Sequence, residues 1–330
     1  MKLGLMLGYW TAAAPPDLIS SAQLAESCGY DSVWTAEAYG SDVVSPLCWI
    51  GANTSTIKLG TGLMQISART PASAAMTAAT IDHLSGGRLI LGLGVSGPQV
   101  VEGWYGQPFP KPLARTREYV DIIRTILRRE KPVEFPGDHY PMPYPGGTGL
   151  GKPLKITVHP LRSEIPIYLG AEGPRNVKMA TEIADGWLPI FYSPYRNDMY
   201  KGITFPKGFE VACPVTMMVT HDVEGGLRLI KMSLSFYIGG MGAKDRNFHL
   251  DVVSRMGFED DARKVQDLFM DGKRDEAVKA VPDALADEIS LVGPRERIRD
   301  RLAAWEESPV TTLLVGARDP DTIKLLPELL

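Results

Sequence analysis

Short apolar runs alternate with segments of helical periodicity along most of the 330-residue chain. The first apolar run, residues 2–8 (KLGLMLG), has the length of a β-strand, and residues 16–29 (PDLISSAQLAESCG) follow with apolar positions at helical spacing. Pro16 and Asp17 at the start of this segment and Gly29 past its end are typical of helix boundaries. The pattern predicts one strand followed by one helix.

The same unit recurs along the rest of the chain. Further strands are expected at residues 31–37, 57–66, 88–94, 165–171, 186–191, 210–220 and 310–317, and helices at residues 43–54, 71–87, 113–130, 174–185, 223–238 and 320–330. The unit that begins at residue 186 has a less regular stretch in place of a clear helix. Eight such alternations predict an α/β fold, a (β/α)8 TIM barrel, with residues 1–330 as a single domain.

Two segments fall outside this count. Residues 131–164 are dense in Pro, Gly and aromatic residues and are too long for an ordinary loop, and residues 243–293 have the pattern of modestly amphipathic helices before the last strand. We expect both to be insertions in βα loops at the C-terminal face, where barrel active sites lie. Both are therefore expected near the chemistry.

Charge, cysteine spacing and the N-terminal sequence indicate which class of protein this is and what it binds. The formal net charge is −4 and no long Lys/Arg block occurs, which argues against nucleic acid and membrane surfaces as partners. Cys28, Cys48 and Cys213 are widely spaced among apolar residues, without metal-ligand spacing, as in buried thiols of a reducing compartment. The short apolar run at the N-terminus is too brief for a secretory signal. We expect a cytoplasmic enzyme with a small-molecule substrate and no metal.

The stretch LILGLGVSGPQ contains Gly92, Gly94 and Gly97 in the spacing G-x-G-x-x-G after an apolar run. A dinucleotide-binding site would place an acidic residue at the end of the next strand, roughly 20 residues on. The candidate, Glu118, lies inside a segment of helical periodicity. We therefore interpret this stretch as the Gly-rich end of a barrel strand rather than as part of a Rossmann sheet.

Two expected strands end in turns of the same design, GVSGP and AEGPRN, in which Gly and small residues precede a Pro that opens a helix. Free N–H groups at such a helix start form an anion site suited to phosphate. Arg175 adds a charged donor to the second turn. The alternative is that both are ordinary turns with proline at the first helical position.

Four stretches of the chain together resemble a known family. The stretches SVWTAEAYGSD, LGTGLMQISARTPA, IDHLSGGRLILGLGVSGPQVVEGWYG and GPRNVKMATEIADGWLP look like the bacterial luciferase-like superfamily, and within it the actinobacterial oxidoreductases that use the deazaflavin coenzyme F420. The resemblance covers essentially the whole chain. It implies a (β/α)8 barrel with the coenzyme across the C-terminal face and its ring on a bulge in the third strand.

The resemblance also implies particular residues. The bulge contains a non-prolyl cis peptide, which by motif falls at Gly62–Leu63 and is followed by Met64. The phosphate turns match Val95, Ser96 and Gly97 in one loop. In the other loop they match Ala171, Gly173, Pro174, Arg175 and Asn176. Arg69, after the bulge strand, would either reach a coenzyme phosphate or pair within the protein.

The departures from the family pattern bear on the reaction. An Asp-His pair is common after the second strand, with the His as base in the sugar-phosphate dehydrogenase branch, and here Glu37 and Ala38 stand in its place. Gly97 stands where that branch has a Glu acid. Without a positioned base, reduction of a C=C or C=N bond, which needs only a proton donor, is favoured over oxidation of an alcohol. Glu37 is the expected catalytic and ring-side residue.

Two alternatives stay open. One is an FMN-dependent luciferase-like monooxygenase, and the other is a non-catalytic barrel that binds a phosphorylated metabolite or a flavin. The substrate itself is not indicated by the sequence. Small and apolar faces in SPLCWIGANT and SAAMTAAT favour a homodimer.

Overall fold

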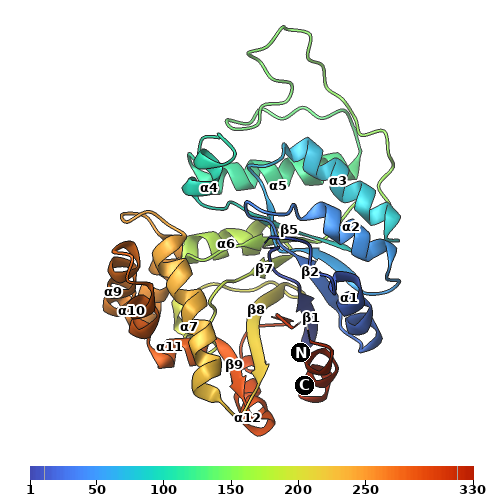
Figure 1. The fold of residues 1–330 in the computed structure, drawn as a ribbon. Helices are drawn as coiled ribbons and strands as arrows, with labels where there is room; N and C mark the ends of the chain where they lie inside the picture. Colours follow the sequence, from blue (N-terminus) through green and yellow to red (C-terminus); the bar gives the residue numbers. More distant parts are fainter. Residues whose placement is uncertain (11, 318) are drawn as a thin grey trace.

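A closed ring of parallel strands forms the centre of the molecule in the computed structural model, which describes residues 1–10, 12–317 and 319–330 (Figure 1). The ring follows the order β1-β2-β3-β5-β6-β7-β8-β10 and closes because β10 pairs with both β1 and β8. The predicted (β/α)8 barrel is confirmed. The strands are β1 (Lys2–Met6), β2 (Ser32–Thr35), β3 (Lys58–Thr61), β4 (Met64–Gln65), β5 (Leu89–Gly94), β6 (Ile167–Gly170), β7 (Gly186–Leu188), β8 (Glu210–Val219), β9 (Ser290–Gly293) and β10 (Thr312–Val315).

Helices surround the ring and follow its strands along the chain. They are α1 (Leu18–Ser27), α2 (Val44–Ala52), α3 (Pro71–Leu84), α4 (Pro98–Gly103), α5 (Pro112–Arg128), α6 (Pro174–Ile183), α7 (Val223–Gly240), α8 (Phe248–Val253), α9 (Glu259–Met270), α10 (Arg274–Ala280), α11 (Asp283–Glu288), α12 (Arg295–Glu306) and α13 (Pro320–Leu325). Shorter turns are the 3₁₀ helices η1 (Asn197–Tyr200) and η3 (Leu326–Glu328) and the π-helical turn η2 (Ser254–Phe258). The irregular stretch expected after β7 corresponds to η1.

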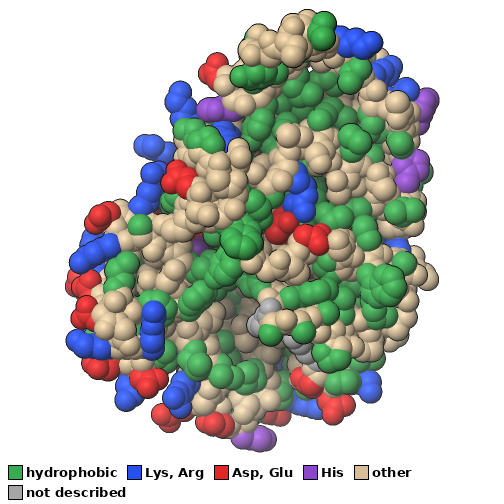
Figure 2. Space-filling model, turned by 45° about the horizontal axis from the view of Figure 1, so that its top comes forward, with side chains coloured by type: hydrophobic (Ala, Val, Ile, Leu, Met, Phe, Trp, Pro, Cys, Tyr) green, Lys and Arg blue, Asp and Glu red, His purple; other side chains and the backbone are tan. Residues whose placement is uncertain are grey.

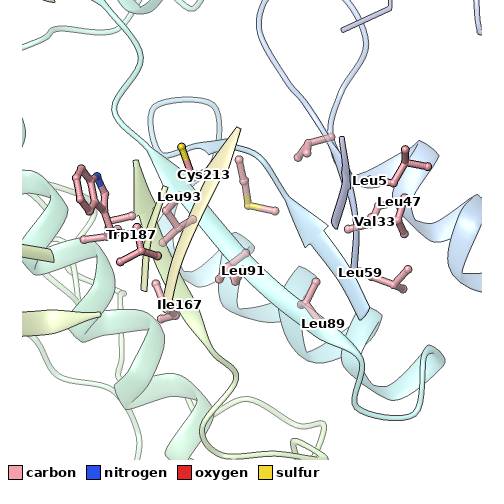
Figure 3. Packing of buried hydrophobic residues seen from close by; sticks show 14 of the residues in the cluster. Leu5, Val33, Leu47, Leu59, Leu89, Leu91, Leu93, Ile167, Trp187 and Cys213 are labelled. Atoms are coloured by element: carbon pink, nitrogen blue, oxygen red, sulfur yellow. The ribbon is translucent and has the colours of Figure 1, made fainter. Parts of the chain in front are cut away.

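Alternation along each strand separates two layers of core. Leu89, Leu91 and Leu93 of β5 face the surrounding helices and belong to the main hydrophobic cluster (Figure 3). Ile90, between them, points the other way and packs inside the ring with Trp34, among others. Successive side chains of a strand point to opposite faces, so one short run of sequence serves both layers.

The inside of the ring is built from a few large side chains and many glycines. The rings of Trp34 and Tyr168 lie 6.0 Å apart across it. A Cβ at Gly60 would overlap the Trp34 ring, and a Cβ at Gly186 would overlap Tyr168. These glycines are required because the aromatic side chains occupy the space that their own side chains would need.

The segment 131–164 does not lie where the sequence analysis placed it. It joins the end of α5 to β6, so it is an αβ connection rather than a βα loop, and in Figure 1 it extends beyond α3 and α5, away from the strands. Its contacts include both helices: the Glu118 carboxylate of α5 accepts the backbone N–H groups of residues 138–140, and Arg162 pairs with the buried Asp82 of α3. The expectation that this segment borders the chemistry was wrong, because length and composition do not indicate the end of the barrel to which a loop belongs.

The second insertion begins earlier than residue 243. Helix α7, which the sequence analysis assigned to the barrel, packs with α8 to α11 in a separate hydrophobic cluster that includes Leu234 and Ile238. The helix that covers the barrel at this point is α12, whose Ile298, Leu302 and Trp305 belong to the main cluster. The second half of β8 extends beyond the ring and pairs with β9. The insertion between β8 and α12 is therefore a βα insertion at the C-terminal face.

Candidate active site

The carboxylate of Glu37 lies just after β2 and is almost wholly buried, with 5% of its side chain exposed. Its Oε2 accepts a hydrogen bond from the backbone N–H of Gln65 at 3.0 Å and one from Arg69 Nη1 at 2.8 Å. The Gln65 side-chain amide donates in turn to the carbonyl of Ala38 at 2.9 Å. The loop after β2 is thus fixed to β4 and to the loop beyond it.

Arg69 pairs within the protein, one of the two alternatives that its sequence position allowed. Burial by itself would lower the pKa of Arg69, but the hydrogen bond and the charge of Glu37 outweigh burial and raise it. The Arg69 carbonyl accepts a hydrogen bond from the Tyr119 hydroxyl at 3.1 Å. Both side chains of the Glu37–Arg69 pair are accordingly held in place.

The bulge between β3 and β4 contains a cis peptide bond at Gly62–Leu63, at the position that the family resemblance implied. The Leu63 side chain lies against Gly94 of β5 and Gly170 of β6, where any Cβ would overlap it. A Cβ at Gly92 would likewise overlap the Thr61 carbonyl. Two of the three glycines in the G-x-G-x-x-G spacing thus make room for the bulge. Neither contributes to a Rossmann turn.

Met64 differs from its neighbours in the bulge. Its side chain is 0% exposed and packs in the main hydrophobic cluster. The whole residue is buried, so Met64 offers no exposed surface to a ligand at the C-terminal face. Alternation along the strand explains this difference from Leu63, which packs with the cluster inside the ring.

The turn after β5 brings Val95, Ser96 and Gly97 to the C-terminal face. Ser96 has a positive φ of 58°, in the left-handed region, and Gly97 is the N-cap of α4. The turn after β6 has a similar design, with Gly173 as the N-cap of α6 and Pro174 at its first position. Because β5 and β6 are paired neighbours, the two turns lie side by side at the same edge of the barrel.

Within the second turn, most polar groups are satisfied by the protein. The Ala171 carbonyl accepts from Trp187 Nε1 at 2.8 Å, and the Asn176 N–H donates to the Gly173 carbonyl at 2.9 Å. Arg175 is exposed and makes no ion pair or side-chain hydrogen bond with any part of the chain that the structure describes. Its charge is therefore free for a ligand.

Arg255 is a second cation at this turn that sequence reasoning missed. It lies in η2 of the insertion, and its Nη1 is 3.8 Å from the position that a Cβ on Gly173 would occupy. Like Arg175 it is exposed, and it forms no ion pair among the described residues. Arg255 is 80 residues after Arg175 in the sequence, so no local sequence pattern indicates that it lies at this turn.

Glu172 and His249 were also missed as site residues. Glu172 lies between Ala171 and Gly173 in the turn, and its Oε1 is 3.1 Å from Nδ1 of His249 at the start of α8. The AEGPRN motif contained Glu172, so its position after a strand was a usable signal. His249 lies in the insertion, where the sequence indicated no particular residue.

The surface supports a ligand site of limited polarity. Figure 2 shows charged side chains of both signs along the edge that carries α9 and α10, and toward the middle of the face apolar side chains surround a small group of acidic and basic ones. Within the described ranges, no group of three or more His, Cys, Asp or Glu side chains is placed to hold a metal ion. The helices that the structure describes include none long and apolar enough to cross a bilayer.

Comparison with known proteins assigns the family. The family model described as luciferase-like monooxygenase matches residues 4–312. A protein of Mycobacterium tuberculosis, provisionally named a coenzyme F420-dependent oxidoreductase, is 50% identical over 337 residues, which are 98% of this chain and 97% of that protein. The 5,10-methylenetetrahydromethanopterin reductase of Methanolobus tindarius is 35% identical over 309 residues, 90% of this chain and 88% of the reductase.

Solved structures show the same fold. The coenzyme F420-dependent tetrahydromethanopterin reductase from Methanopyrus kandleri superposes with a TM-score of 0.78 at 24% identity, covering 100% of this chain and 98% of that one. An F420-dependent secondary alcohol dehydrogenase superposes with a TM-score of 0.74 at 19% identity, with the same coverage. The barrel, the bulge and the extent of these matches agree, and the chain belongs to the luciferase-like monooxygenase family.

Proposed function

We propose that this protein is an oxidoreductase that uses coenzyme F420 and reduces a C=C or C=N bond of a small organic substrate. The observation that carries the proposal is the bulge at Gly62–Leu63, seated on Gly94 and Gly170 between two turns that can receive an anion. The names of the relatives at 50% and 35% identity support this cofactor or its reaction class.

The residues present fit a flat coenzyme with a phosphate. Leu63 and the glycines beside it leave backbone close to the surface, which permits a planar ring to approach. Arg175 and Arg255 supply two guanidinium groups, without ion-pair partners among the described residues, at the N-terminus of α6, where charge and the helix dipole stabilise a phosphate. In this proposal Val95, Ser96, Gly97, Ala171, Gly173, Pro174 and Asn176 complete the binding surface through their backbone or small side chains.

When bound, a reduced deazaflavin supplies a hydride at one carbon of its ring. The protein's own contribution begins with Glu37, which holds Arg69 and the Gln65 N–H and so fixes the backbone next to Leu63. Since its Oε2 already accepts two hydrogen bonds and faces a guanidinium, Glu37 acts in this proposal by positioning that surface rather than by giving up a proton. Apolar walls around the bulge exclude water from the bond that is reduced.

A titration of the purified protein with F420 and with FMN, followed by quenching of its tryptophan fluorescence, tests the cofactor. We expect much tighter binding of F420. Equal or tighter binding of FMN would instead favour the monooxygenase alternative, and binding of neither would contradict an oxidoreductase of this family. Gly170→Val is the comparison variant for this titration. Its added side chain occupies the space of Leu63 and displaces the bulge, so it should bind F420 less tightly than wild type.

We also propose that the protein is a homodimer. Trp49 of α2 is 64% exposed and Met76 of α3 is 59% exposed, and large apolar side chains in this position are favourable in an interface between copies of the chain. Light scattering at micromolar concentration should give twice the mass of the chain. A monomer under those conditions would contradict this part of the proposal.

A further inference from the structure

A cluster of aromatic and ionisable side chains lies where the insertion meets the barrel. It consists of Glu172 after β6, Phe191 after β7, Tyr237 of α7 and His249 of α8, with Tyr9 after β1 hydrogen-bonded to Tyr237. We call these five residues the histidine cluster. They come from three barrel strands and two insertion helices, so only the folded insertion brings them together.

The imidazole of His249 is held on several sides. The Phe191 ring stands edge-on to it at 5.9 Å and the Tyr237 ring at 5.0 Å, with interplanar angles of 82° and 87°. The backbone is fixed as well, because Asn247 Oδ1 accepts the N–H groups of His249 and Leu250, both at 3.0 Å. The ring is therefore placed by packing and by the start of α8, and 16% of the side chain remains exposed.

Several polar atoms in the histidine cluster have no hydrogen-bond partner within the described residues. His249 Nδ1 and Glu172 Oε1 are 3.1 Å apart, and within the described residues His249 Nδ1 and Glu172 Oε2 are buried without a hydrogen-bond partner. Nε2 of His249 makes no hydrogen bond with the part of the chain that the structure describes. Such contacts are often loose in a free enzyme and tighten when the site is filled.

The other ionisable groups nearby are poorly suited to give up a proton at neutral pH. Burial, and then the neighbouring Tyr9, raise the pKa of the Tyr237 hydroxyl above its ordinary value. Arg255, near the same turn, stays charged. Glu37 is engaged with Arg69 at 2.8 Å. His249 is placed by packing and has ring nitrogens without a hydrogen-bond partner among the described residues, so it is the group in this region equipped to transfer a proton.

We propose that His249 is the proton donor of the reduction and that Glu172 is its positioning residue. The inference rests on the proposed function, which supplies the hydride from reduced deazaflavin. The hydride adds to one end of the C=C or C=N bond while the Nε2–H bond of the imidazolium breaks and its proton forms a C–H or N–H bond at the other end. The deazaflavin is oxidised by two electrons, the substrate is reduced, and His249 is left neutral until water reprotonates it.

The cluster also defines a class of substrate. Phe191, Tyr237 and Tyr9 offer flat apolar walls, and Glu172 places a carboxylate directly behind the donor. A planar, uncharged or cationic acceptor, such as a cyclic enone or a cyclic imine, is compatible with this environment. An acceptor with an anionic group beside the reduced bond is disfavoured by the Glu172 charge.

The first test does not depend on turnover. Carbethoxylation of the five histidines by diethylpyrocarbonate, followed by peptide mass spectrometry, measures how accessible each ring is. We expect saturating F420 to slow the modification of His249 several-fold while His83 and His221 react as before. Equal rates at His249 with and without F420 would overturn the proposal whatever the turnover measurements show.

The second test uses 2-cyclohexen-1-one and 1-pyrroline as acceptors with reduced F420. His249→Ala should lower kcat by about 10²-fold with KM within a few-fold, and free imidazole should restore part of the rate. Glu172→Gln should lower kcat less and leave F420 affinity unchanged, and Glu172→Asp should recover part of the loss. A His249→Ala rate within threefold of wild type, or a loss of F420 affinity beyond tenfold, would overturn the assignment.

The outcomes separate the two proposals. If wild-type protein does not bind F420, the proposed function fails before the histidine cluster is tested. If F420 binds and protects His249, its place beside the coenzyme is supported even where neither acceptor is reduced. Asp251→Asn, on the exposed side of the same helix, is the control variant, and we expect wild-type behaviour from it.

Discussion

Two carboxylates stand at the C-terminal face, and their surroundings differ. Glu37 has 5% of its side chain exposed, accepts a backbone N–H and the Arg69 guanidinium, and draws both partners from the loop and strand that follow β3. Glu172 is 22% exposed, has one oxygen without a partner, and faces an imidazole from an insertion helix. The first carboxylate is paired with a cation within the barrel. The second can contact a ligand that binds beside it.

The comparison shows which kind of contact is available for chemistry. Breaking a buried ion pair leaves an uncompensated charge, and the fold loses stability. A partly exposed pair with unused hydrogen-bonding capacity contributes little to stability and can change its partners when a ligand arrives. We therefore expect substitutions at the Glu37–Arg69 pair to act mainly on folding and on the bulge, and substitutions at Glu172 to act mainly on turnover.

The largest effect is expected at Arg69. Arg69→Met should lower the free energy of unfolding by about 3 to 5 kcal/mol, because Glu37 is left charged and buried. Urea denaturation measures this change. Arg263→Met is the matched control, since the Arg263–Glu259 pair is 65% and 57% exposed and should contribute far less to the free energy of unfolding.

A double-mutant cycle sharpens this result. Glu37→Gln combined with Arg69→Met should be less destabilising than the sum of the single changes, because the double variant leaves no unpaired charge. Strict additivity would show that the two side chains do not depend on each other. The two carboxylates would then not differ in this respect.

The next effect concerns coenzyme binding at Arg175. Arg175→Ala should weaken F420 binding by about 1.5 to 3 kcal/mol, roughly tenfold to a hundredfold, because a charge-assisted hydrogen bond to phosphate is lost. Fluorescence titration measures the affinity, and kcat at saturating F420 should recover. Lys178→Ala, on the exposed side of the same helix, is the control. Unchanged affinity in Arg175→Ala would make this turn an ordinary helix start.

Glu26 is a carboxylate with a structural role, and it lies at the end of the barrel opposite to the candidate site. Burial alone would raise its pKa, but the backbone N–H groups of Ile57, Thr56 and Ser55 lower it to about 2. Its pKa in the folded state is below the unfolded value of 4.5, so its contribution is present above about pH 4.5 and is lost as the pH falls toward 2.

Glu26→Gln tests that contribution. With allowance for solvent screening, we expect a loss of about 1 to 2 kcal/mol in the free energy of unfolding at pH 7 and a much smaller difference near pH 2. Catalytic parameters should not change. Glu306→Gln, an exposed carboxylate of α12, serves as the reference. A difference that grows as the pH falls would contradict the sign of this linkage.

The smallest effect on folding is expected at Glu172. Glu172→Gln should change the free energy of unfolding by less than about 1 kcal/mol, in contrast to Arg69→Met. The same urea denaturation measures it. A loss as large as that of Arg69→Met would show that the Glu172–His249 contact holds the insertion on the barrel, and the contrast between the two carboxylates would be one of degree.

Much of the fold followed from local patterns. The strand at residues 88–94 and the helix at residues 113–130 were predicted because period and boundary residues within one segment decide both. The cis peptide at Gly62–Leu63 was anticipated from motif resemblance. Helix α7 was assigned to the barrel wrongly, because an amphipathic pattern shows that a helix has an apolar face and not which core covers it.

The sequence by itself determined the barrel, the strand ends and the small residues at the bulge and at the two turns, since each depends on neighbours within about one turn or strand. Only the tertiary structure decided that Gly92 and Gly94 accommodate the bulge, that Arg69 pairs with Glu37, and that Arg255 and His249 reach the turn after β6. Those contacts join residues separated by tens of positions. Their geometry depends on how the barrel closes and how the insertion packs on it, which no local period encodes.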